Sequence, residues 1–285
     1  MLITRASSLA FGVVRISPRT LSSGQTLAAG DIPSIQLYQY AICPFCHKVK
    51  ALLAYSGLKY EIIEVNPLNK AEIKWSKDYK KVPIAKLDGT SLLGSDEIMK
   101  GILEDSRIAS NLEKRWDGRM TMARFQHKDT KKWVDFANDE LSSLLYPNIC
   151  RTVGDAYAAF GYVNEVESFS PFQRVAIRSI GSLAMYFAAS RVKINISNAL
   201  GLGTEKRRIT DEQQALNLLL DRFEKEGLKN GDSFLSGADE PNLGDLAIYG
   251  TLRSIEGLPV HDRLIRERGG NMGRWYDRVA AIVVN

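Results

Sequence analysis

Apolar residues recur with two different spacings in the two parts of this 285-residue chain. Between residues 33 and 104, short apolar runs alternate with segments of helical spacing, which predicts alternating strands and helices. The predicted elements are a strand at Ile35–Tyr38, a helix that follows Cys43, a strand at Tyr60–Val65, a short helix at Ala71–Ser76, strands at Ile84–Leu87 and Ser91–Leu93 around an Asp88-Gly89-Thr90 turn, and a helix at Glu97–Leu103 capped by Ser95 and Asp96. Their order is βαβαββα.

From about Lys114 onward, strand signals stop and helical spacing takes over. Helices are predicted at Lys128–Leu145, Phe172–Lys193, Asp211–Glu226, Leu243–Glu256 and Gly273–Val283. Asn242, three residues before Asp245, resembles the first residue of a capping box. The charged segment 105–118 ends at a glycine and has the composition of a linker. We therefore expect an α/β domain over residues 33–104, a linker over 105–118 and an all-α domain over 119–285.

Cys43 and Cys46, separated by Pro44 and Phe45, lie at the predicted turn between the first strand and the first helix. At a helix N-terminus, unpaired backbone N–H groups and the helix dipole favour a thiolate over a thiol. A free thiol has a pKa of about 8.5, so a downward shift would make Cys43 a competent nucleophile at neutral pH. Cys46 is then the candidate resolving thiol. A Cys-x-x-Cys pair after the first strand of a βαβαββα order predicts a thioredoxin-like (glutaredoxin-like) domain.

Three other interpretations of this cysteine pair are weaker. A structural zinc site needs two further ligands, but the only other cysteine is Cys150, and His127 and His261 are isolated. His47 completes the Cys-x-x-Cys-His pattern of c-type haem attachment, but the neighbouring strands argue against the small helical fold of that class. Three cysteines in 285 residues do not make a disulfide framework. We expect a reactive thiol and no metal site.

A second set of candidate binding residues follows the cysteines. Val82-Pro83 precedes the third strand, where thioredoxin-like proteins have a cis-proline. A cis bond would leave the backbone N–H and C=O of Val82 free to pair with a peptide in strand fashion. Ser95 and Asp96, at a helix N-terminus, suit an α-carboxylate and its ammonium group. An ordinary trans proline and a plain helix cap are the alternatives. With the thiol, these groups predict a site for glutathione.

Composition and charge limit the class of protein. Hydrophobic residues make up 45% of the chain and charged residues 25%, which is ordinary for a globular protein. The net charge is +5, but Arg5, Arg15 and Arg19 supply three of these charges within residues 1–30, which contain no acid. The remainder has no strong basic bias, so we expect no nucleic-acid partner. The apolar runs Leu9–Val14 and Ile180–Ala189 are too short to span a bilayer.

The N-terminal residues have a composition of their own. They are rich in Ser, Thr, Leu and Ala and free of Asp and Glu, which is typical of an organelle transit peptide. We expect residues 1–32 to direct import to mitochondria rather than plastids. A disordered tail is the alternative, and the protein would then be cytoplasmic or membrane-associated.

Six stretches distributed over residues 33–285 resemble one known family. They are LYQY…CPFCHKVKALL (Leu37–Leu53), EVNPLNKAEIK (Glu64–Lys74), KVPI (Lys81–Ile84), YPNICRT (Tyr146–Thr152), AMYFAASR (Ala184–Arg191) and PNLGDLAIYGTLRSIEGL (Pro241–Leu258). The family is the membrane-associated type 2 prostaglandin E synthases, a glutathione-transferase-like group. Cys-Pro-Phe-Cys is shared with glutaredoxins, so the stretches in the helical part make the resemblance specific. It implies that the helical part is a glutathione-transferase C-terminal-like domain.

The resemblance also implies a function. Members of the family are intramolecular oxidoreductases that isomerise prostaglandin H2 to prostaglandin E2, and they can bind glutathione together with haem. Their catalytic cysteine corresponds to Cys43, and their active-site tyrosine and phenylalanine correspond to Tyr40 and Phe45. Their glutathione contacts correspond to Val82 and, in reversed order, to Ser95 and Asp96. Tyr40 is expected to orient the Cys43 sulfur, although it could instead be a core aromatic.

Two other functions remain open. A glutaredoxin-like thiol-disulfide oxidoreductase would need both Cys43 and Cys46, whereas an isomerase needs only Cys43. A glutathione- or haem-binding protein with little turnover would need neither as a nucleophile. Tyr146, Met185 and Tyr186 are candidate pocket residues, with core packing as the other interpretation. A lipid endoperoxide substrate, a homodimer and peripheral membrane contact are further expectations.

Overall fold

The computed structural model describes residues 32–115, 122–126, 128–191, 212–228 and 234–283. Its N-terminal part is built on a four-stranded sheet with the strand order β2-β1-β3-β4. The strands are β1 (Ile35–Gln39), β2 (Glu61–Glu64), β3 (Ile84–Leu87) and β4 (Thr90–Leu93). Strand β1 is parallel to β2 and antiparallel to β3, which is antiparallel to β4. This arrangement confirms the predicted thioredoxin-like sheet. The expected transit peptide lies outside the described residues, apart from Ile32.

The two faces of this sheet pack into two different hydrophobic clusters. Ile35 and Leu37 of β1 belong to the large hydrophobic core, whereas Tyr38 belongs to a smaller cluster that also contains Cys46. Successive strand residues point to opposite faces, so the change of core follows directly from the sequence. The parallel pair β1 and β2 needs a crossover connection, which helix α1 (Pro44–Tyr55) supplies. The turn that leads into this crossover carries Cys43.

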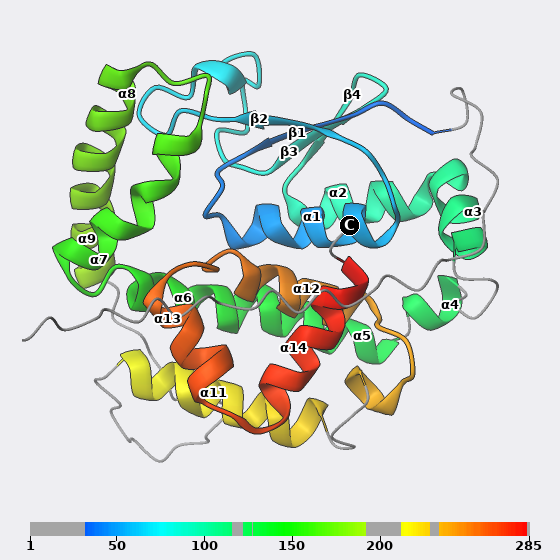
Figure 1. Cartoon of the computed structure of the whole chain (residues 1–285). Coiled ribbons are helices and arrows are strands. Elements are labelled where there is room, and N and C mark those ends of the chain that lie inside the picture. The colour runs from blue at the N-terminus through cyan, green and yellow to red at the C-terminus, as the bar shows by residue number, and fades with distance from the viewer. Residues whose placement is uncertain (1–31, 116–121, 127, 192–211, 229–233, 284–285) are drawn as a thin grey trace, which may run out of the picture.

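Helices cover one face of the sheet and form the rest of the protein. Figure 1 shows α1 and α2 directly beneath the strands and the C-terminal helices below them. The helical elements after the sheet are α2 (Ser95–Glu104), α3 (Ser106–Arg115), α4 (Met122–Phe125), α5 (Lys128–Asp135), η2 (Phe136–Leu141), α6 (Ser142–Ile149), α7 (Val153–Ala159), η3 (Phe160–Glu165), α8 (Pro171–Ala176), η4 (Ile177–Gly181), α9 (Ser182–Arg191), α11 (Glu212–Gly227), η5 (Leu235–Gly237), α12 (Leu243–Arg253), α13 (Pro259–Asp262), η6 (Arg263–Glu267) and α14 (Gly270–Val283). A short 3-10 turn, η1 (Ala71–Ile73), lies between β2 and β3.

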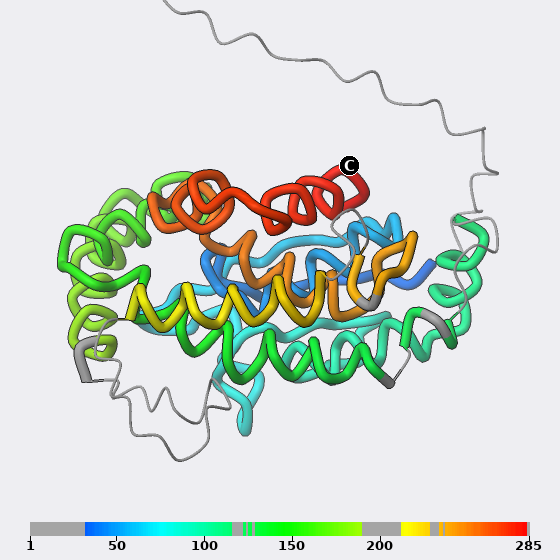
Figure 2. Tube along the Cα trace, turned by 90° about the horizontal axis from the view of Figure 1, so that it is seen from below, coloured from blue at the N-terminus to red at the C-terminus, as the bar shows by residue number. Residues whose placement is uncertain are grey.

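Helix α12 joins the sheet domain to the helical bundle. It packs against α1 on one side and against α5, η2 and α14 on others. Figure 2 shows α11, α12 and the continuous helical segment from α5 to α6 lying side by side. Helices α7–α9 lie at one end of the molecule and α3–α4 at the other. Nine consecutive residues of α12, from Gly244 to Leu252, are buried, so this helix forms the centre of the protein. The large hydrophobic core therefore extends from β1 to α14.

The start of α12 is fixed by the capping box that the sequence predicted. The Asn242 side chain accepts from the N–H of Asp245, and the Asp245 side chain accepts from the N–H of Asn242. The Asp245 carboxylate, which is fully buried, also accepts from the Leu235 N–H at 3.0 Å and from the Trp275 indole at 2.7 Å. One side chain therefore connects α12, the preceding loop and α14.

Several predicted boundaries differ from the structure. The segment expected to be a linker contains helix α3, because Ile108 and Leu112 are buried in the core. The expected cap of α2 was wrong: the helix begins at Ser95, and Gly94, with φ 85°, is its N-cap. The helix predicted to end at Leu145 continues to Ile149. Helices α7 and α13 were not predicted because they are too short to show a helical period.

No helix in the described ranges is long and apolar enough to cross a bilayer.

Candidate active site

Cys43 occupies the N-cap position of α1, as the sequence predicted. Its backbone is extended, with φ −79° and ψ 119°, and Pro44 follows at the first helical position. The Cys43 N–H donates to the carbonyl of Tyr40 at 2.9 Å, and the carbonyl of Cys43 accepts from the N–H of His47 at 3.1 Å. Proline suits the first helical position because its missing N–H would have no partner there. The thiol is therefore fixed at the positive end of a 12-residue helix.

The two cysteines have opposite acid–base character. A hydrogen bond from the Cys46 side chain, followed by the backbone N–H groups of Cys46 and Phe45 and by the charge of Lys48, lowers the pKa of Cys43 against the effect of burial. Burial raises the pKa of Cys46, and the neighbouring Cys43 raises it further. Cys43 is partly exposed and Cys46 is buried. The site therefore has one accessible, acidic thiol and one buried thiol that donates a hydrogen bond to it.

Glu64 at the end of β2 fixes the loop that precedes Cys43. Its two carboxylate oxygens accept from the Ala41 N–H at 2.7 Å and from the Gln39 side chain at 3.0 Å. Burial raises the pKa of Glu64 to about 6. The Nε2 of His47 contacts the Ala41 carbonyl at 2.7 Å, and burial lowers the pKa of this imidazole to about 3, so the neutral ring donates there. The loop is thus held from both sides, which keeps the thiol in place.

Tyr40 stands beside the two cysteines. Burial, followed by the charges of Cys43 and Cys46, raises the pKa of its phenol to about 12. The hydroxyl therefore stays protonated at neutral pH and remains a hydrogen-bond donor. Its recorded link to Cys43 runs through the Tyr40 backbone carbonyl rather than the hydroxyl.

Lys48 connects the helix of the thiol to the expected glutathione residues. Its side chain is completely buried, and its Nζ donates to Oδ1 of Asn138 and lies 3.8 Å from Oδ1 of Asp96. Asn138 in turn donates to the two oxygens of Asp96 at 3.2 and 3.1 Å. The ammonium also lies 4.8 Å from the centre of the Phe45 ring. Burial lowers the pKa of Lys48 to about 8, so it is largely protonated at neutral pH.

Gly250 of α12 allows α1 to approach closely enough for this network. A Cβ at position 250 would lie 2.5 Å from the carbonyl oxygen of His47 and 2.7 Å from the Cα of Lys48. Both are backbone atoms, so a side chain could be accommodated only by moving one helix. The packing of α12 on α1 thus sets the depth at which Lys48 is buried.

The expected peptide-binding residues lie around the same helix N-terminus. The Val82–Pro83 bond is cis, as predicted, and the Pro83 carbonyl accepts from the Gly94 N–H at 3.0 Å. Within the described ranges, no backbone hydrogen bond is recorded for Val82. Ser95 is buried and its hydroxyl lies 3.4 Å from Oδ1 of Asp96, whose own side chain is 68% exposed. The residues present therefore offer a strand-like backbone pair and an exposed carboxylate, which fits glutathione.

A cavity of about 290 Å³ opens beside the loop before Cys43. Ala41 and Ile42 form one side, and Tyr162 of η3 and the loop after α12 form the other. Burial raises the pKa of Tyr162, with smaller contributions from the charges of Glu64, Tyr40 and both cysteines. The cavity is a candidate binding site for the apolar part of a substrate.

Three comparisons relate this arrangement to known proteins. The model for the glutathione S-transferase N-terminal domain matches residues 37–107. Prostaglandin E synthase 2 of Danio rerio is 31% identical to this chain, in an alignment that covers 86% of this chain and 70% of the relative. Prostaglandin E synthase 2 of Mus musculus is 30% identical, in an alignment that covers 92% of this chain and 73% of the relative. The chain belongs to the prostaglandin E synthase 2 family. The β-etherase LigF of Sphingobium sp. strain SYK-6 shares the fold, with a TM-score of 0.50 and 17% identity over 87% of this chain and 95% of its own.

The prostaglandin E synthase 2 family positions predicted from sequence come together in the fold. Cys43, Phe45 and Cys46 share the first turn of α1, and Tyr40 lies just before it. Val82 packs in the same small cluster as Cys46, and Asp96 reaches the site through Lys48. The fold is the predicted thioredoxin-like domain followed by a helical glutathione-transferase C-terminal-like domain.

Tyr146, Met185 and Tyr186 lie apart from these positions. Each is partly buried against the large hydrophobic core. The Tyr146 hydroxyl donates to the carbonyl of Met185 at 3.0 Å, which joins α6 to α9. These side chains therefore support packing of the helical part.

Sequence reasoning missed Lys48, Asn138, Glu64 and Tyr162. One signal for Lys48 was available, since positions 48, 52 and 55 lie on one face of α1 and the other two are apolar. A lysine on an apolar helix face is rarely buried without a partner. Asn138 and Tyr162 are brought to the site by tertiary packing and carry no local signal.

Proposed function

We propose that the Cys43 site isomerises a lipid endoperoxide of the prostaglandin H2 type, with glutathione bound beside the thiol. Membership of the prostaglandin E synthase 2 family supports this class of reaction. The observation that carries the proposal is the difference between the two thiols, because only Cys43 is both accessible and acidic. A one-thiol mechanism needs such an asymmetry.

One thiolate is sufficient for this isomerisation, and the atoms and electrons of each step balance. The Cys43 sulfur attacks the endoperoxide oxygen on C9, an S–O bond forms and the O–O bond breaks. The C11 oxygen leaves as an alkoxide and takes a proton to become the C11 hydroxyl. Loss of the C9 proton then forms the C9 ketone while the S–O bond breaks, which returns the thiolate. The product is an isomer of the substrate, so no electrons are gained or lost.

The neighbouring aromatic side chains have separate roles in this proposal. Tyr40, which remains protonated because its pKa is about 12, donates a hydrogen bond to the sulfur or to the developing oxyanion. Phe45 covers the start of α1 and shields Lys48 from water through their contact at 4.8 Å. The cavity beside Ile42 and Tyr162 takes one of the apolar substrate chains.

Val82, Pro83, Ser95 and Asp96 would hold glutathione. The backbone groups of Val82 pair with the peptide in strand fashion, while Asp96 takes the ammonium group and the N-terminus of α2 takes the α-carboxylate. When bound, glutathione supplies a second thiol beside Cys43. The family's haem remains an expectation, and no step here depends on it. A homodimer and contact with a membrane surface are likewise carried over from the family as proposals.

Dithiol exchange of the glutaredoxin type is the second candidate. The hydrogen bond between the Cys46 and Cys43 side chains brings a resolving thiol next to the nucleophile. The burial of Cys46, which raises its pKa, opposes this role because a thiolate is needed at that position during reduction.

The two candidates are separated by offering the protein both substrates. Purified protein with glutathione is incubated with prostaglandin H2 and, separately, with a mixed disulfide of glutathione, and the products are quantified. The proposal predicts a 9-keto, 11-hydroxy product above the spontaneous rate and little disulfide reduction. The reverse pattern would replace it with dithiol exchange, and inactivity on both would indicate a binding protein.

A further inference from the structure

Lysines are concentrated between the end of β2 and the end of β3. Residues 70–86 contain six lysines and two acids, a net charge of +4 in a chain whose total is +5. Residues 1–30 supply three further positive charges, so the rest of the chain is net negative. Most protein surfaces mix charges of both signs, and a region of one sign favours a partner of the opposite sign. The six residues, which we call the lysine cluster, are Lys70, Lys74, Lys77, Lys80, Lys81 and Lys86.

The charge of the lysine cluster is not neutralised by neighbouring acids. Its exposed members are Lys74, Lys77, Lys80 and Lys81. Within the part of the chain that the structure describes, no ion pair is recorded for any of the six lysines. Glu72, one of the two acids, is occupied by the backbone, because its Oε2 accepts from the Asn66 N–H at 2.8 Å. Asp78 is then the one exposed acid within residues 70–86.

Two apolar side chains are exposed in the same loop. Trp75 is 41% exposed and Leu68 is 45% exposed. The Trp75 indole N–H donates to the Glu72 carbonyl at 2.8 Å, and its ring lies edge-on to Tyr38 at 5.4 Å. The Lys86 ammonium lies 4.1 Å from the centre of the Trp75 ring. The ring is thus held in place beside ammonium groups, a combination that is typical of surfaces that meet the headgroup region of a membrane.

The loop adjoins the Cys43 site. Ile73 of η1 is fully buried in the small hydrophobic cluster that contains Cys46 and Val82. Tyr79 packs against the same cluster. Figure 1 shows the loop, in light blue, above the sheet and on the side opposite α1 and α2. A partner that covers the loop would therefore lie next to the thiol site and away from the helical bundle.

Helix α8 adds exposed apolar surface on the same side of the molecule. In Figure 1 it stands above the level of the sheet, as the loop does. Its Phe172 is 82% exposed and its Val175 is 66% exposed. A flat partner on this side would reach both segments, which favours a membrane.

The chemistry of the lysine cluster favours a lipid surface over a nucleic acid. Residues 70–86 contain no arginine. Arginine binds a phosphate through two parallel N–H groups, which suits nucleic-acid recognition. Lysine is a compact charge, and polybasic segments of this kind are attracted by the negative potential of an anionic headgroup layer.

We propose that the loop from Asn66 to Lys81, together with Lys86, docks on an anionic lipid surface. The ammonium groups contact the headgroups, while Trp75 and Leu68 enter the boundary between headgroups and acyl chains. The Cys43 site then lies next to the membrane, from which a lipid substrate can enter. That last step rests on the proposed function, whereas the docking itself does not.

The test measures binding of the full-length protein to vesicles by flotation, with no substrate present. Phosphatidylcholine vesicles with about 30% phosphatidylserine should bind at least about tenfold more strongly than phosphatidylcholine alone. Binding should weaken between about 0.1 M and about 0.5 M salt. Equal binding to both vesicles, or tighter binding to a single-stranded oligonucleotide or to polyglutamate at the same salt concentration, would overturn the proposal. A failure of the isomerase proposal does not affect this result.

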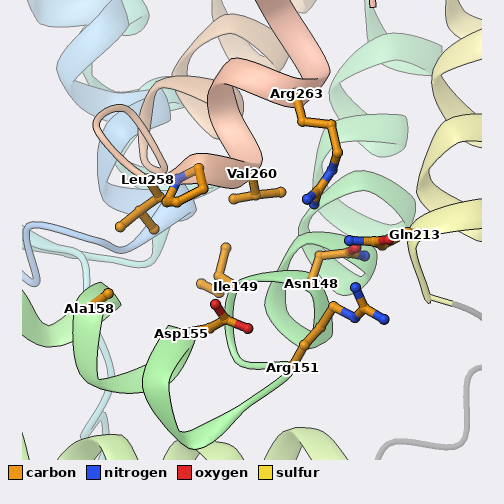
Figure 3. A pocket seen from close by; sticks show the side chains of 10 residues that line it. Asn148, Ile149, Arg151, Asp155, Ala158, Gln213, Leu258, Val260 and Arg263 are labelled. Carbon is orange, nitrogen blue, oxygen red and sulfur yellow. The ribbon is translucent and has the colours of Figure 1, made fainter. Parts of the chain in front are cut away.

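A matched pair of variants locates the contact. Lys74→Gln/Lys77→Gln should weaken vesicle binding about tenfold or more, because each lysine at an anionic headgroup layer strengthens binding about fivefold. The control is Arg151→Gln/Arg263→Gln, which removes the same charge from the helical part. Figure 3 shows these two arginines at a cavity of about 190 Å³ that Asp155 also lines, and α6 and α13, which border it, lie beneath the sheet in Figure 1. Thermal melting checks that both variants fold, and an equal loss of binding would overturn the assignment.

The N-terminal arginines are a second control, because a basic segment can bind the same vesicles. Arg5→Gln/Arg15→Gln should weaken binding less than Lys74→Gln/Lys77→Gln. Loss of binding in the arginine variant, with binding retained in the lysine variant, would place the contact in residues 1–30 and overturn the proposal.

Trp75 provides a direct readout of insertion. Vesicle lipids brominated in their acyl chains should quench tryptophan fluorescence of the wild type. Trp75→Phe should remove most of this quenching, because Trp133 and Trp275 are buried. Absence of quenching in the wild type, or quenching that persists in Trp75→Phe, would contradict the proposed contact.

Discussion

The Nζ of Lys48 lies 3.8 Å from Oδ1 of Asp96, and the lysine side chain is fully buried while the aspartate is 68% exposed. This pair connects the helix that carries Cys43 with the helix whose N-terminus is expected to hold glutathione. It also places a positive charge beneath the thiol, where it favours the thiolate. The binding proposed at Asp96 and the reactivity proposed at Cys43 would therefore be linked through one buried ammonium group.

The first prediction concerns the acidity of Cys43. Because the Cys46 hydrogen bond is the largest cause of the lowered pKa and the Lys48 charge a smaller one, Cys46→Ala should raise the pKa of Cys43 more than Lys48→Met. The measurement is the rate of iodoacetamide alkylation as a function of pH. Lys100→Met is the control, since Lys100 is exposed and pairs with Glu104. A larger shift from Lys48→Met than from Cys46→Ala would contradict the assigned order.

Glutathione binding should depend on Asp96. Replacing Asp96 with alanine removes a charge-assisted contact and is expected to weaken binding by about 1.5–3 kcal/mol, measured by calorimetry. Glu97→Ala is the matched control, because Glu97 is an exposed acid in the same first turn of α2. Equal loss from both substitutions would indicate a general effect of charge, and unchanged affinity in Asp96→Ala would mean that Asp96 does not contact glutathione.

The helix contact at Gly250 gives a prediction about stability. Gly250→Ala places a Cβ 2.5 Å from the His47 carbonyl oxygen, so it should lower the free energy of unfolding by about 1–3 kcal/mol. The control is Gly154→Ala, where the nearest atom would be 3.6 Å away and the residue lies in helix α7. That change should be neutral or stabilising by about 0.5–1 kcal/mol. Denaturant titration distinguishes the two, and similar values for both would show that the α1–α12 contact can relax.

Asp245 gives a prediction about pH. Burial raises its pKa to about 6 from an ordinary value of 3.8, although four N–H donors oppose this shift. An acid with a raised folded pKa stabilises the fold most below its ordinary pKa, and that contribution is lost as pH rises through about 6. Asp245→Asn does not titrate and leaves one oxygen for several donors, so it should be less stable at both ends of the range. The advantage of the wild type should shrink by up to about 3 kcal/mol between about pH 4 and pH 7. A constant difference in unfolding free energy would contradict the raised pKa.

Much of the sheet domain could be predicted because its signals are local. The strand spacing, the Asp88-Gly89 turn and the Cys-Pro-Phe-Cys sequence each act over a few residues, and the structure has β1, β3, β4 and α1 close to the expected places. The capping box at Asn242 is equally local and is present. The cap of α2 was misplaced because Ser95 is a common N-cap residue, whereas the chain uses Gly94 at a positive φ that glycine adopts without strain.

The residues that surround the thiol could not be predicted from local sequence signals. Lys48 and Asn138 are 90 positions apart in the chain and meet because α12 packs against α1 and also against α5 and η2. Tyr162 reaches the site from η3, a short turn without a periodic pattern. Contacts of this kind depend on how the helices pack, and no single stretch of the sequence determines that packing.

The central claim is that the site works with one thiol, and the direct measurement is the rate of prostaglandin E2 formation from prostaglandin H2 by Cys43→Ser and Cys46→Ser. A serine at position 43 cannot form the anion at neutral pH, so Cys43→Ser should lose most of the activity above the spontaneous rate. Cys46→Ser keeps a hydrogen-bond donor beside Cys43 and should retain a substantial part of it. Equal loss in the two variants would contradict the one-thiol account and favour dithiol exchange.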